Sequence, residues 1–215
     1  MNCPFSCKPR WERRKDARPQ ELLAAALDLF VERGFASTRL EDVAKRAGVS
    51  KGTLYLYFTN KEELFKAVVR ENLVPELGVA EEAVANFTGD TRELFGLSVM
   101  LWWDRIGNSK LSGISKLIMA EAGNFPELAA FYHEEVITRV NQLIVDLLDR
   151  GIARGEFRQV DTQETARLVA AQLVMLMMWK HSFGACQNQS ISSENYLKCM
   201  IDLCLNGLTK PISSL

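Results

Sequence analysis

The sequence of 215 residues lacks the signatures of common enzymes. It contains two histidines, His133 and His181, and it has no P-loop, G-x-G-x-x-G or G-x-S-x-G motif. The run HEEVI at residues 133–137 is not H-E-x-x-H, because Ile137 stands where the second metal ligand would be. Neither histidine follows a glutamate by three residues, as a di-iron bundle requires. We therefore predict a protein that is not an enzyme and that uses no metal or cofactor.

Long apolar runs are absent as well. No stretch of 18 apolar residues occurs, and no apolar run follows the charges of the N-terminal sequence MNCPFSCKPRWERRKDARP. These features argue against a membrane span and a secretory signal, so we expect a cytoplasmic protein. The cysteines are odd in number and irregularly spaced, which in a reducing compartment indicates free thiols. They are Cys3, Cys7, Cys186, Cys199 and Cys204, and the first two could form half of a metal site only with ligands from elsewhere.

Charge is small overall but unevenly distributed. The formal net charge is -1, yet residues 1–74 hold 14 Lys and Arg against 10 Asp and Glu, while the remainder holds 12 against 17. With 47% hydrophobic residues, the chain is long enough for one large domain, or for a small domain and a larger one. The cationic N-terminal part is therefore the part expected to contact an anion.

Helical periodicity begins near residue 19. Pro19 suits a first helical turn, Gly34 suits a C-terminal cap, and the apolar residues between them recur at i, i+3, i+4 and i+7. These apolar residues are Leu23, Ala26, Leu27 and Phe30. A second helix is expected to start at Thr38, because Thr38 and Glu41 have the spacing of a capping box, and to end at Gly48.

The next segment, SKGTLYLYF at residues 50–58, alternates polar and apolar residues as a β-strand would. A strand would need a partner, and no second run with such alternation and flanking turns occurs. A helix over residues 51–58 would place Leu54 and Phe58 on one face, with Ser50 as its cap. We therefore predict a helix-turn-helix. Its outer surface would suit a groove lined with phosphates, although an αα-hairpin with tyrosines as surface cover is the alternative.

The run LFVERGFASTRLEDVAKRAGVSKGTLYLYFTNKEELFKAVV, residues 29–69, resembles the N-terminal DNA-binding domain of the TetR family of bacterial transcriptional regulators. The resemblance includes the G-F/Y-x-x-T link, the D-V-A-x-x-A-G-V-S-x-G-T-L-Y core and the Y-F-x-x-K-E-x-L-F closure. Relatives often have His or another polar residue at position 56. Because this chain has Leu56, contact with a thymine methyl and simple packing both stay open for that side chain.

The resemblance implies an all-α protein that works as a homodimer on a near-palindromic DNA operator. It implies a three-helix head over about 19–58 and a connecting helix over about 60–74, so that residues 19–74 form the DNA-binding domain and residues 75–215 the effector-binding and dimerisation domain. Thr38 and Arg39 would contact phosphates. Tyr57 and Lys61 would hold phosphates across the groove, while the major groove would be faced by Lys51, Gly52, Thr53 and Tyr55.

Residues 1–18 would form a basic arm that carries Arg10, Arg13, Arg14, Lys15 and Arg18. Such an arm can lie in the adjacent minor groove or along phosphates, or it can be a solvated tail. Beyond Pro75 we expect helices at about 76–86, 91–107, 110–123, 125–154, 161–183 and 193–207. From Leu168 to Trp179 every residue except Gln172 is apolar, so one side of this helix needs a partner, most simply a second copy. A long helix over about 126–152 would complete that dimer interface with Val136, Val140, Leu143 and Leu147.

Large adaptable side chains accumulate in the body, where they are either plain core or the lining of a pocket for a hydrophobic or aromatic effector. The predicted ligand-binding residues are Trp102, Trp103, Met119, Phe131, His133, Met175, Met178 and Trp179, with Met100 nearby and Arg105, Asn141 and Gln172 as further polar anchors. We predict a repressor whose effector tilts the connecting helix. The alternatives are a constitutive DNA-binding regulator without ligand and an all-helical metal-binding or enzymatic bundle.

Overall fold

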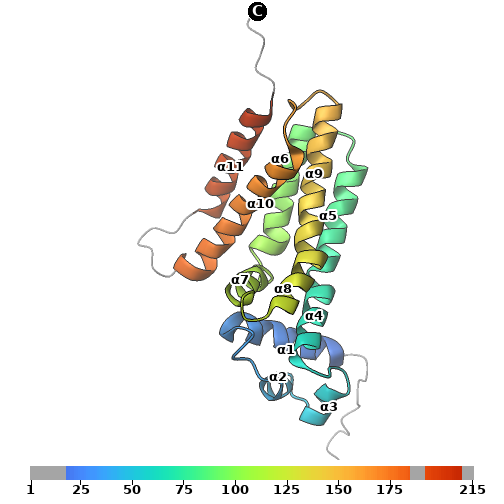
Figure 1. The fold of residues 1–215 in the computed structure, drawn as a ribbon, viewed down its shortest axis with the longest axis vertical. Coiled ribbons are helices and arrows are strands. Elements are labelled where there is room, and N and C mark those ends of the chain that lie inside the picture. The colour runs from blue at the N-terminus through green and yellow to red at the C-terminus, as the bar shows by residue number, and fades with distance from the viewer. Residues whose placement is uncertain (1–17, 185–191, 210–215) are drawn as a thin grey trace, which may run out of the picture.

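The computed structural model describes residues 18–184 and 192–209. Four helices form the N-terminal head at the bottom of Figure 1. They are α1 (Arg18–Arg33), α2 (Leu40–Arg46), α3 (Lys51–Tyr55) and α4 (Lys61–Asn72). The basic residues 10–15 and the cysteines at 3, 7 and 186 lie outside the described residues. Asn60 caps α4 by accepting the backbone N–H of Glu63 at 2.7 Å.

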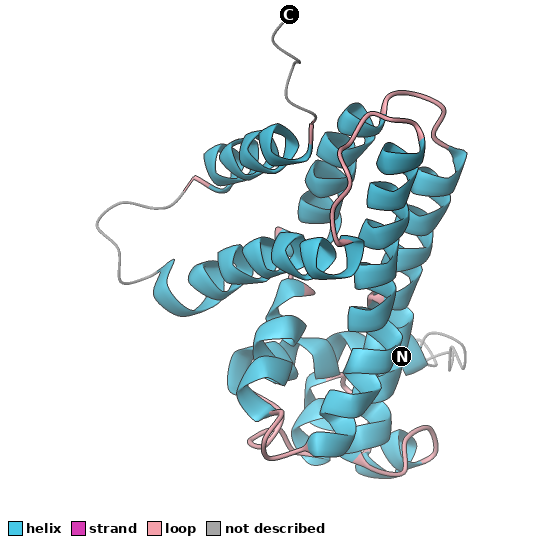
Figure 2. Cartoon of the chain, turned by 45° about the horizontal axis from the view of Figure 1, so that its top comes forward, coloured by secondary structure: helices cyan, strands magenta, loops and turns pink. Residues whose placement is uncertain are grey.

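The body consists of α5 to α11 and three π-helical segments. Its elements are α5 (Val74–Asn86), α6 (Thr91–Trp102), η1 (Trp103–Gly107), α7 (Ser112–Glu121), α8 (Pro126–Tyr132), η2 (His133–Ile137), α9 (Thr138–Ala153), α10 (Thr162–Met178), η3 (Trp179–Phe183) and α11 (Ser193–Leu208). Over the described ranges there is no strand, and Figure 2 shows helices joined by short loops. The predicted all-α fold is therefore confirmed. None of the helices in these ranges is long and apolar enough to cross a membrane.

The core of the head continues into the lower body. Phe35, in the α1–α2 loop, packs against Phe30 of α1 and Phe65 of α4 with ring centroids 5.6 and 5.7 Å apart. Phe125, in the α7–α8 turn, packs edge-on against Phe35 at 4.8 Å. This aromatic cluster joins the head to the two body helices that lie directly above α1 in Figure 1.

The π-helical segment η2 joins α8 to α9, whereas η1 and η3 form the C-terminal ends of α6 and α10. In η1, a side chain at Gly107 would collide with the ring of Trp103, to which a Cβ would come within 2.2 Å. In η2, the hydroxyl of Thr138 donates to the carbonyl oxygen of His133, five residues earlier, at 3.0 Å. Local side-chain contacts therefore accompany both segments, and π-turns often occur at functional sites.

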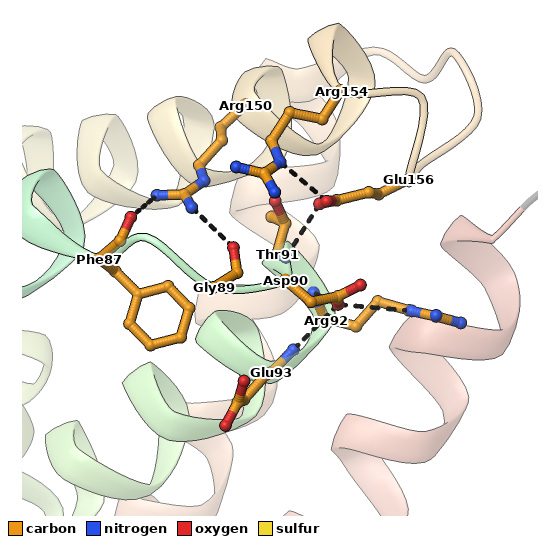
Figure 3. Close-up of polar contacts among 9 residues, drawn as sticks. All are labelled: Phe87, Gly89, Asp90, Thr91, Arg92, Glu93, Arg150, Arg154 and Glu156. Carbon is orange, nitrogen blue, oxygen red and sulfur yellow. Dashed lines mark hydrogen bonds and ion pairs between the residues drawn. The ribbon is translucent and has the colours of Figure 1, made fainter.

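A polar cluster, drawn in Figure 3, joins the α5–α6 loop to the C-terminal end of α9, which lies opposite the head in Figure 1. The guanidinium of Arg150 donates to the carbonyl oxygens of Phe87 and Gly89 at 2.6 and 2.9 Å, and so fixes the α5–α6 loop. The carboxylate of Glu156 accepts the backbone N–H of Thr91 at 2.9 Å, and Arg154 donates to it at 2.8 Å. Hydrogen bonding from Thr91, followed by Arg154, lowers the pKa of Glu156 to about 2.

The predicted dimer face of the long helix is wrong. Val136 and Leu147 are buried, and Val140 and Leu143 pack against the two core clusters, because this stripe faces α10, α6 and α5 of the same chain. Exposed apolar side chains occur on several helices of the body, and the two most exposed lie on α10 and α11. Leu168 and Met175 of α10 are 67% and 53% exposed, and Leu203 of α11 is 73% exposed. The prediction that one side of the helix at 168–179 is uncovered in the monomer is therefore confirmed.

Candidate nucleic-acid interface and effector cavity

The turn between α2 and α3 depends on a glycine and a capping serine. Gly48 has a φ of 68°, a left-handed conformation that a glycine adopts without the steric cost of a Cβ. Ser50 then caps α3, since its hydroxyl oxygen accepts the backbone N–H of Thr53 at 3.1 Å. The helical prediction for this segment is confirmed over Lys51–Tyr55, whereas residues 56 and 57 form a turn.

The segment is anchored on one side and exposed on the other. Leu54 is fully buried in the head core, and Phe58 packs partly against it, as the i, i+4 spacing predicted. Tyr55 and Tyr57 are exposed, and Leu56 is 82% exposed, so Leu56 does not pack. A large apolar side chain held in solvent on a rigid scaffold is available for contact with a partner, and thymine methyl groups are apolar partners in a major groove. Leu56 thus joins the surface predicted from the sequence.

Gly52 has no role in the local fold. It lies in the first turn of α3 without a positive φ, and the only atom close to an added Cβ would be the Oγ of Ser50, at 3.8 Å. Because glycine destabilises a helix interior by about 1 kcal/mol relative to alanine, its presence here is unfavourable for the head alone. The missing side chain leaves room for another molecule to approach α3 closely.

Some cationic side chains of the head are held in ion pairs, and others are not. Lys51 is paired with Glu41 of α2 at 2.5 Å, and Arg46 forms a bidentate pair with Glu32 of α1 at 2.8 Å for both bonds. The hydrogen bond from Lys51 lowers the pKa of Glu41. Arg39 is exposed and has no ion pair among the described residues. The α3 surface therefore combines a paired lysine with a free arginine at the start of α2.

Two of the predicted phosphate contacts face the protein itself. Thr38 is only 1% exposed, and its hydroxyl donates to the carbonyl oxygen of Gly34 at 2.7 Å, with that of Leu29 at 3.2 Å. The predicted capping role of Thr38 is wrong, because Arg39 is the residue before α2 and makes no side-chain cap. The Thr38 hydroxyl therefore holds the α1–α2 loop, and a phosphate contact by Thr38 stays a prediction.

Lys61 has a similar internal role. Its ammonium donates to the carbonyl oxygens of Phe35 and Ala36 at 2.7 and 3.1 Å, and it lies 4.4 Å from the centroid of the Phe35 ring. Partial burial lowers the pKa of Lys61, although nearby Glu62 and Glu121 oppose that shift. From α7, the carboxylate of Glu121 accepts the backbone N–H of Ala36 at 3.2 Å. Lys61 and Glu121 together hold the α1–α2 loop, and a phosphate contact by Lys61 stays a prediction.

An apolar cavity of about 130 Å³ lies in the body where α4 meets α5, between η1, α7, η2 and α10. Its polar side chains are Ser115, Tyr132 and Asn141. Burial raises the pKa of Tyr132, and the hydrogen bond with Ser115 partly offsets this shift. The other lining residues are Leu73, Leu77, Trp102, Ile106, Ile118, Met119, Val136, Ile137, Val140, Ala170, Val174 and Met177.

The sequence identified only part of this lining. Trp102 and Met119 line the cavity, as does Asn141, which was expected as a polar anchor. The remaining predicted residues are placed elsewhere, because composition cannot tell which way a helix faces. Trp103 lies in the upper core, Phe131 packs beside Lys66 and Arg70, His133 and Met175 are exposed, and Met178 and Trp179 are half-buried outside this lining. Arg105 pairs with Glu76, and Gln172 lies in a groove beside α11.

Some lining residues that were not predicted for the ligand site share a helical spacing in the sequence. Val136 and Val140, which the sequence placed in a dimer interface together with Leu143 and Leu147, line the cavity, and so does Tyr132, one turn before Val136. Tyr132, Val136 and Val140 are spaced at i, i+4 and i+8 and form one wall of the cavity.

Comparisons with known proteins agree with this arrangement. The family model described as "Bacterial regulatory proteins, tetR family" matches residues 22–68. A second model, described as "AefR-like transcriptional repressor, C-terminal domain", matches residues 103–201. The first match spans the helix-turn-helix and most of α4, and the second spans most of the body.

Individual relatives cover nearly the whole chain. The HTH-type transcriptional repressor KstR2 of Rhodococcus jostii is 28% identical over 199 residues, which are 92% of this chain and 94% of that protein. The HTH-type transcriptional activator FasR of Mycolicibacterium smegmatis is 26% identical over 196 residues, 91% of this chain and 84% of that protein. The solved structure of FadR from Bacillus subtilis in complex with stearoyl-CoA has the same fold, with a TM-score of 0.74 and 20% identity over 87% of this chain and 98% of that chain. With matches to both the head and the body, and with the fold they share, the chain belongs to the TetR family of bacterial DNA-binding regulators.

Proposed function

We propose that this chain is a homodimeric transcriptional repressor that a small apolar effector releases from a near-palindromic operator. The exposed α3 surface is the observation that carries the proposal. Gly52, Tyr55, Leu56 and Tyr57 are exposed there, and none of them belongs to the buried core of the head. Side chains on such a surface can reach base edges in the major groove, while Arg39 and the α2–α3 turn face the phosphates.

The proposed domains separate DNA binding from effector binding and dimerisation. Residues 19–74 bind DNA, and residues 75–215 bind the effector and form the dimer. Two heads would enter successive major grooves when their α3 helices lie about 34–36 Å apart, one turn of B-DNA. The dimer face that supports this geometry best is the exposed apolar surface of α10 and α11, formed by Leu168, Met175 and Leu203. Replacing two of these side chains, as in Met175→Glu with Leu203→Glu, should give a monomer in analytical ultracentrifugation that no longer binds the operator.

The cavity is connected to the head by two routes. Leu73, between α4 and α5, lines the cavity itself. On either side of it, Arg70 pairs with Glu135 of η2 at 2.6 Å, and Glu76 pairs with Arg105 of η1 at 2.9 Å. Movement of the cavity wall would therefore act on α4, the helix expected to tilt.

The second route runs through α7. Ser115 and Met119 face the cavity from α7, and Glu121 at the end of the same helix holds the backbone of Ala36 in the head. Gly113 of α7 packs so closely on α1 that an added Cβ would lie 2.6 Å from a methyl carbon of Val31. An effector that displaces α7 would disturb α1 and the α1–α2 loop. It would achieve release only by binding more tightly to the DNA-incompetent state.

The test starts from an operator selected from random duplexes with the purified protein. Leu56→Ala should change affinity unevenly among operator variants, because it removes a contact to bases. Arg39→Ala should weaken all variants alike and reduce the dependence of log affinity on log salt by about one unit. The control is Arg92→Ala, which removes one exposed positive charge from α6 at the far end of the body. If Leu56→Ala and Arg39→Ala bind DNA like the control, the docking is wrong.

A further inference from the structure

The cavity lining carries no charge. None of the described residues that line it is Asp, Glu, Lys, Arg or His. A carboxylate, phosphate or ammonium group inside it would lose its hydration without gaining a counter-charge, which is strongly unfavourable. The portion of an effector that occupies this cavity should therefore be uncharged.

Two hydroxyl groups that hydrogen-bond to each other belong to residues that line the cavity. The Oη of Tyr132 and the Oγ of Ser115 lie 2.9 Å apart, and both residues line the cavity. The pair has two O–H hydrogens, but only one of them can be used between the two oxygens. No other side-chain hydrogen bond of either residue is found within the described ranges. One O–H hydrogen is therefore available to an acceptor atom of a ligand.

The remaining polar group is Asn141. It is half-buried, it lines the cavity from α9, and its carboxamide makes no hydrogen bond to the described residues. A carboxamide has both a donor and an acceptor, so it can accept a hydroxyl or donate to an oxygen. Both polar positions of the cavity therefore favour a neutral oxygen-bearing group, and the other lining residues are apolar.

Size gives a second limit. Engineered apolar cavities of about 150 Å³ bind benzene, and the space of about 130 Å³ here, which opens to solvent beside Met119 and Ile137, holds roughly one ring. A smaller cavity of about 50 Å³ lies beyond it, and the two share Leu77, Trp102 and Val140 as lining residues. A longer ligand would have to displace this partition.

We propose that the effector is an uncharged molecule about the size of one substituted ring, bearing a carbonyl or hydroxyl oxygen that accepts a hydrogen bond from the Tyr132–Ser115 pair. This inference rests on the proposed function, because it assigns the ligand class of the same cavity. It gives a chemical reason for selection, since a site built to donate a hydrogen bond rejects analogues that lack the acceptor.

The first experiment measures binding to the purified protein without DNA, by calorimetry. The probes are acetophenone, ethylbenzene as its apolar counterpart, benzoate as the charged analogue and stearoyl-CoA as a long ligand. Acetophenone should bind roughly three- to tenfold more tightly than ethylbenzene, the effect of one net hydrogen bond. Benzoate should bind more weakly than both. Ala170→Phe, which places a ring in the cavity, should abolish binding of both neutral probes.

Variants separate the hydrogen bond from the fold. The double variant Tyr132→Phe with Ser115→Ala removes both hydroxyls, so it should bind acetophenone and ethylbenzene equally, while its ethylbenzene affinity stays within about twofold of wild type. Retained ethylbenzene binding shows that the double variant still folds around an intact cavity. If the double variant proves unfolded, Ser115→Ala alone should keep the preference, because Tyr132 still donates.

The outcomes distinguish this inference from the proposed function. Equal affinity of the wild-type protein for acetophenone and ethylbenzene, no binding of either, or tightest binding of benzoate or stearoyl-CoA would overturn the ligand class, whatever happens at the operator. Operator affinity is then measured with and without acetophenone. If acetophenone binds as expected but leaves operator affinity unchanged, the ligand class stands and release by an effector fails.

Discussion

Replacing Thr38 with valine tests whether this residue holds the head together or contacts DNA. Valine matches the shape of threonine but lacks the hydroxyl. The substitution leaves the carbonyl oxygen of Gly34, which now accepts from the Thr38 hydroxyl at 2.7 Å, without that donor. Because Thr38 is 1% exposed, water cannot replace the hydroxyl without opening the α1–α2 loop.

The expected effect is on stability. Loss of one buried hydrogen bond that leaves its partner unsatisfied costs about 1–3 kcal/mol. In a chain of this size, each kcal/mol corresponds to about 2–4 °C in the melting temperature. Taking about 2 kcal/mol, Thr38→Val should melt about 4–8 °C below wild type. Thr38→Ser keeps the hydroxyl and loses one methyl group, worth about 0.8 kcal/mol, so it should melt only about 2–3 °C lower.

The assay combines thermal unfolding with operator binding at a temperature where every variant is folded. Thr38→Val should keep the salt dependence of operator binding seen in wild type, because no phosphate contact is lost. The opposite result would refute the reasoning. If Thr38→Val melts like wild type, but binds every operator more weakly and with a smaller salt slope, then the hydroxyl is a phosphate contact.

Three further predictions concern other parts of the molecule. Glu41→Gln should free Lys51 from its ion pair, so operator binding should become tighter and more salt-dependent, whereas unchanged titrations by fluorescence anisotropy would mean that Lys51 stays away from DNA. Gly52→Ala should stabilise the fold by about 1 kcal/mol, which raises the melting temperature, and should weaken operator binding. Weakened binding without the gain in stability would contradict the account of this glycine. The folded-state pKa of Glu156 lies at about 2, below its ordinary value of 4.5, so its stabilising effect is present above about pH 4.5 and is lost as the pH falls towards 2. Glu156→Gln should therefore be less stable than wild type in denaturant titrations at pH 7, by a margin that shrinks below pH 4.5, and a margin independent of pH would exclude this explanation.

Local chemistry made much of the head readable from the sequence. Gly48 and Ser50 define the turn and the start of α3 through backbone conformation and capping, which involve only neighbouring residues. The i, i+4 pair Leu54 and Phe58 then outweighs the strand-like alternation, because a lone strand has no partner. Because caps and periodicity are also local, the predicted bounds of the body helices were close to those observed.

What the sequence by itself determined is the set of helices, the helix-turn-helix and the apolar helix with an uncovered side, since these depend on periodicity and caps. Only the tertiary structure decided which way side chains face across helices distant in sequence. It turned Thr38 and Lys61 inward onto the α1–α2 loop, and it placed Val136 and Val140, which were expected in a dimer face, in the wall of the cavity. The physical reason is that a periodic pattern shows only that a face must be buried. Which partner buries that face is decided by packing between elements.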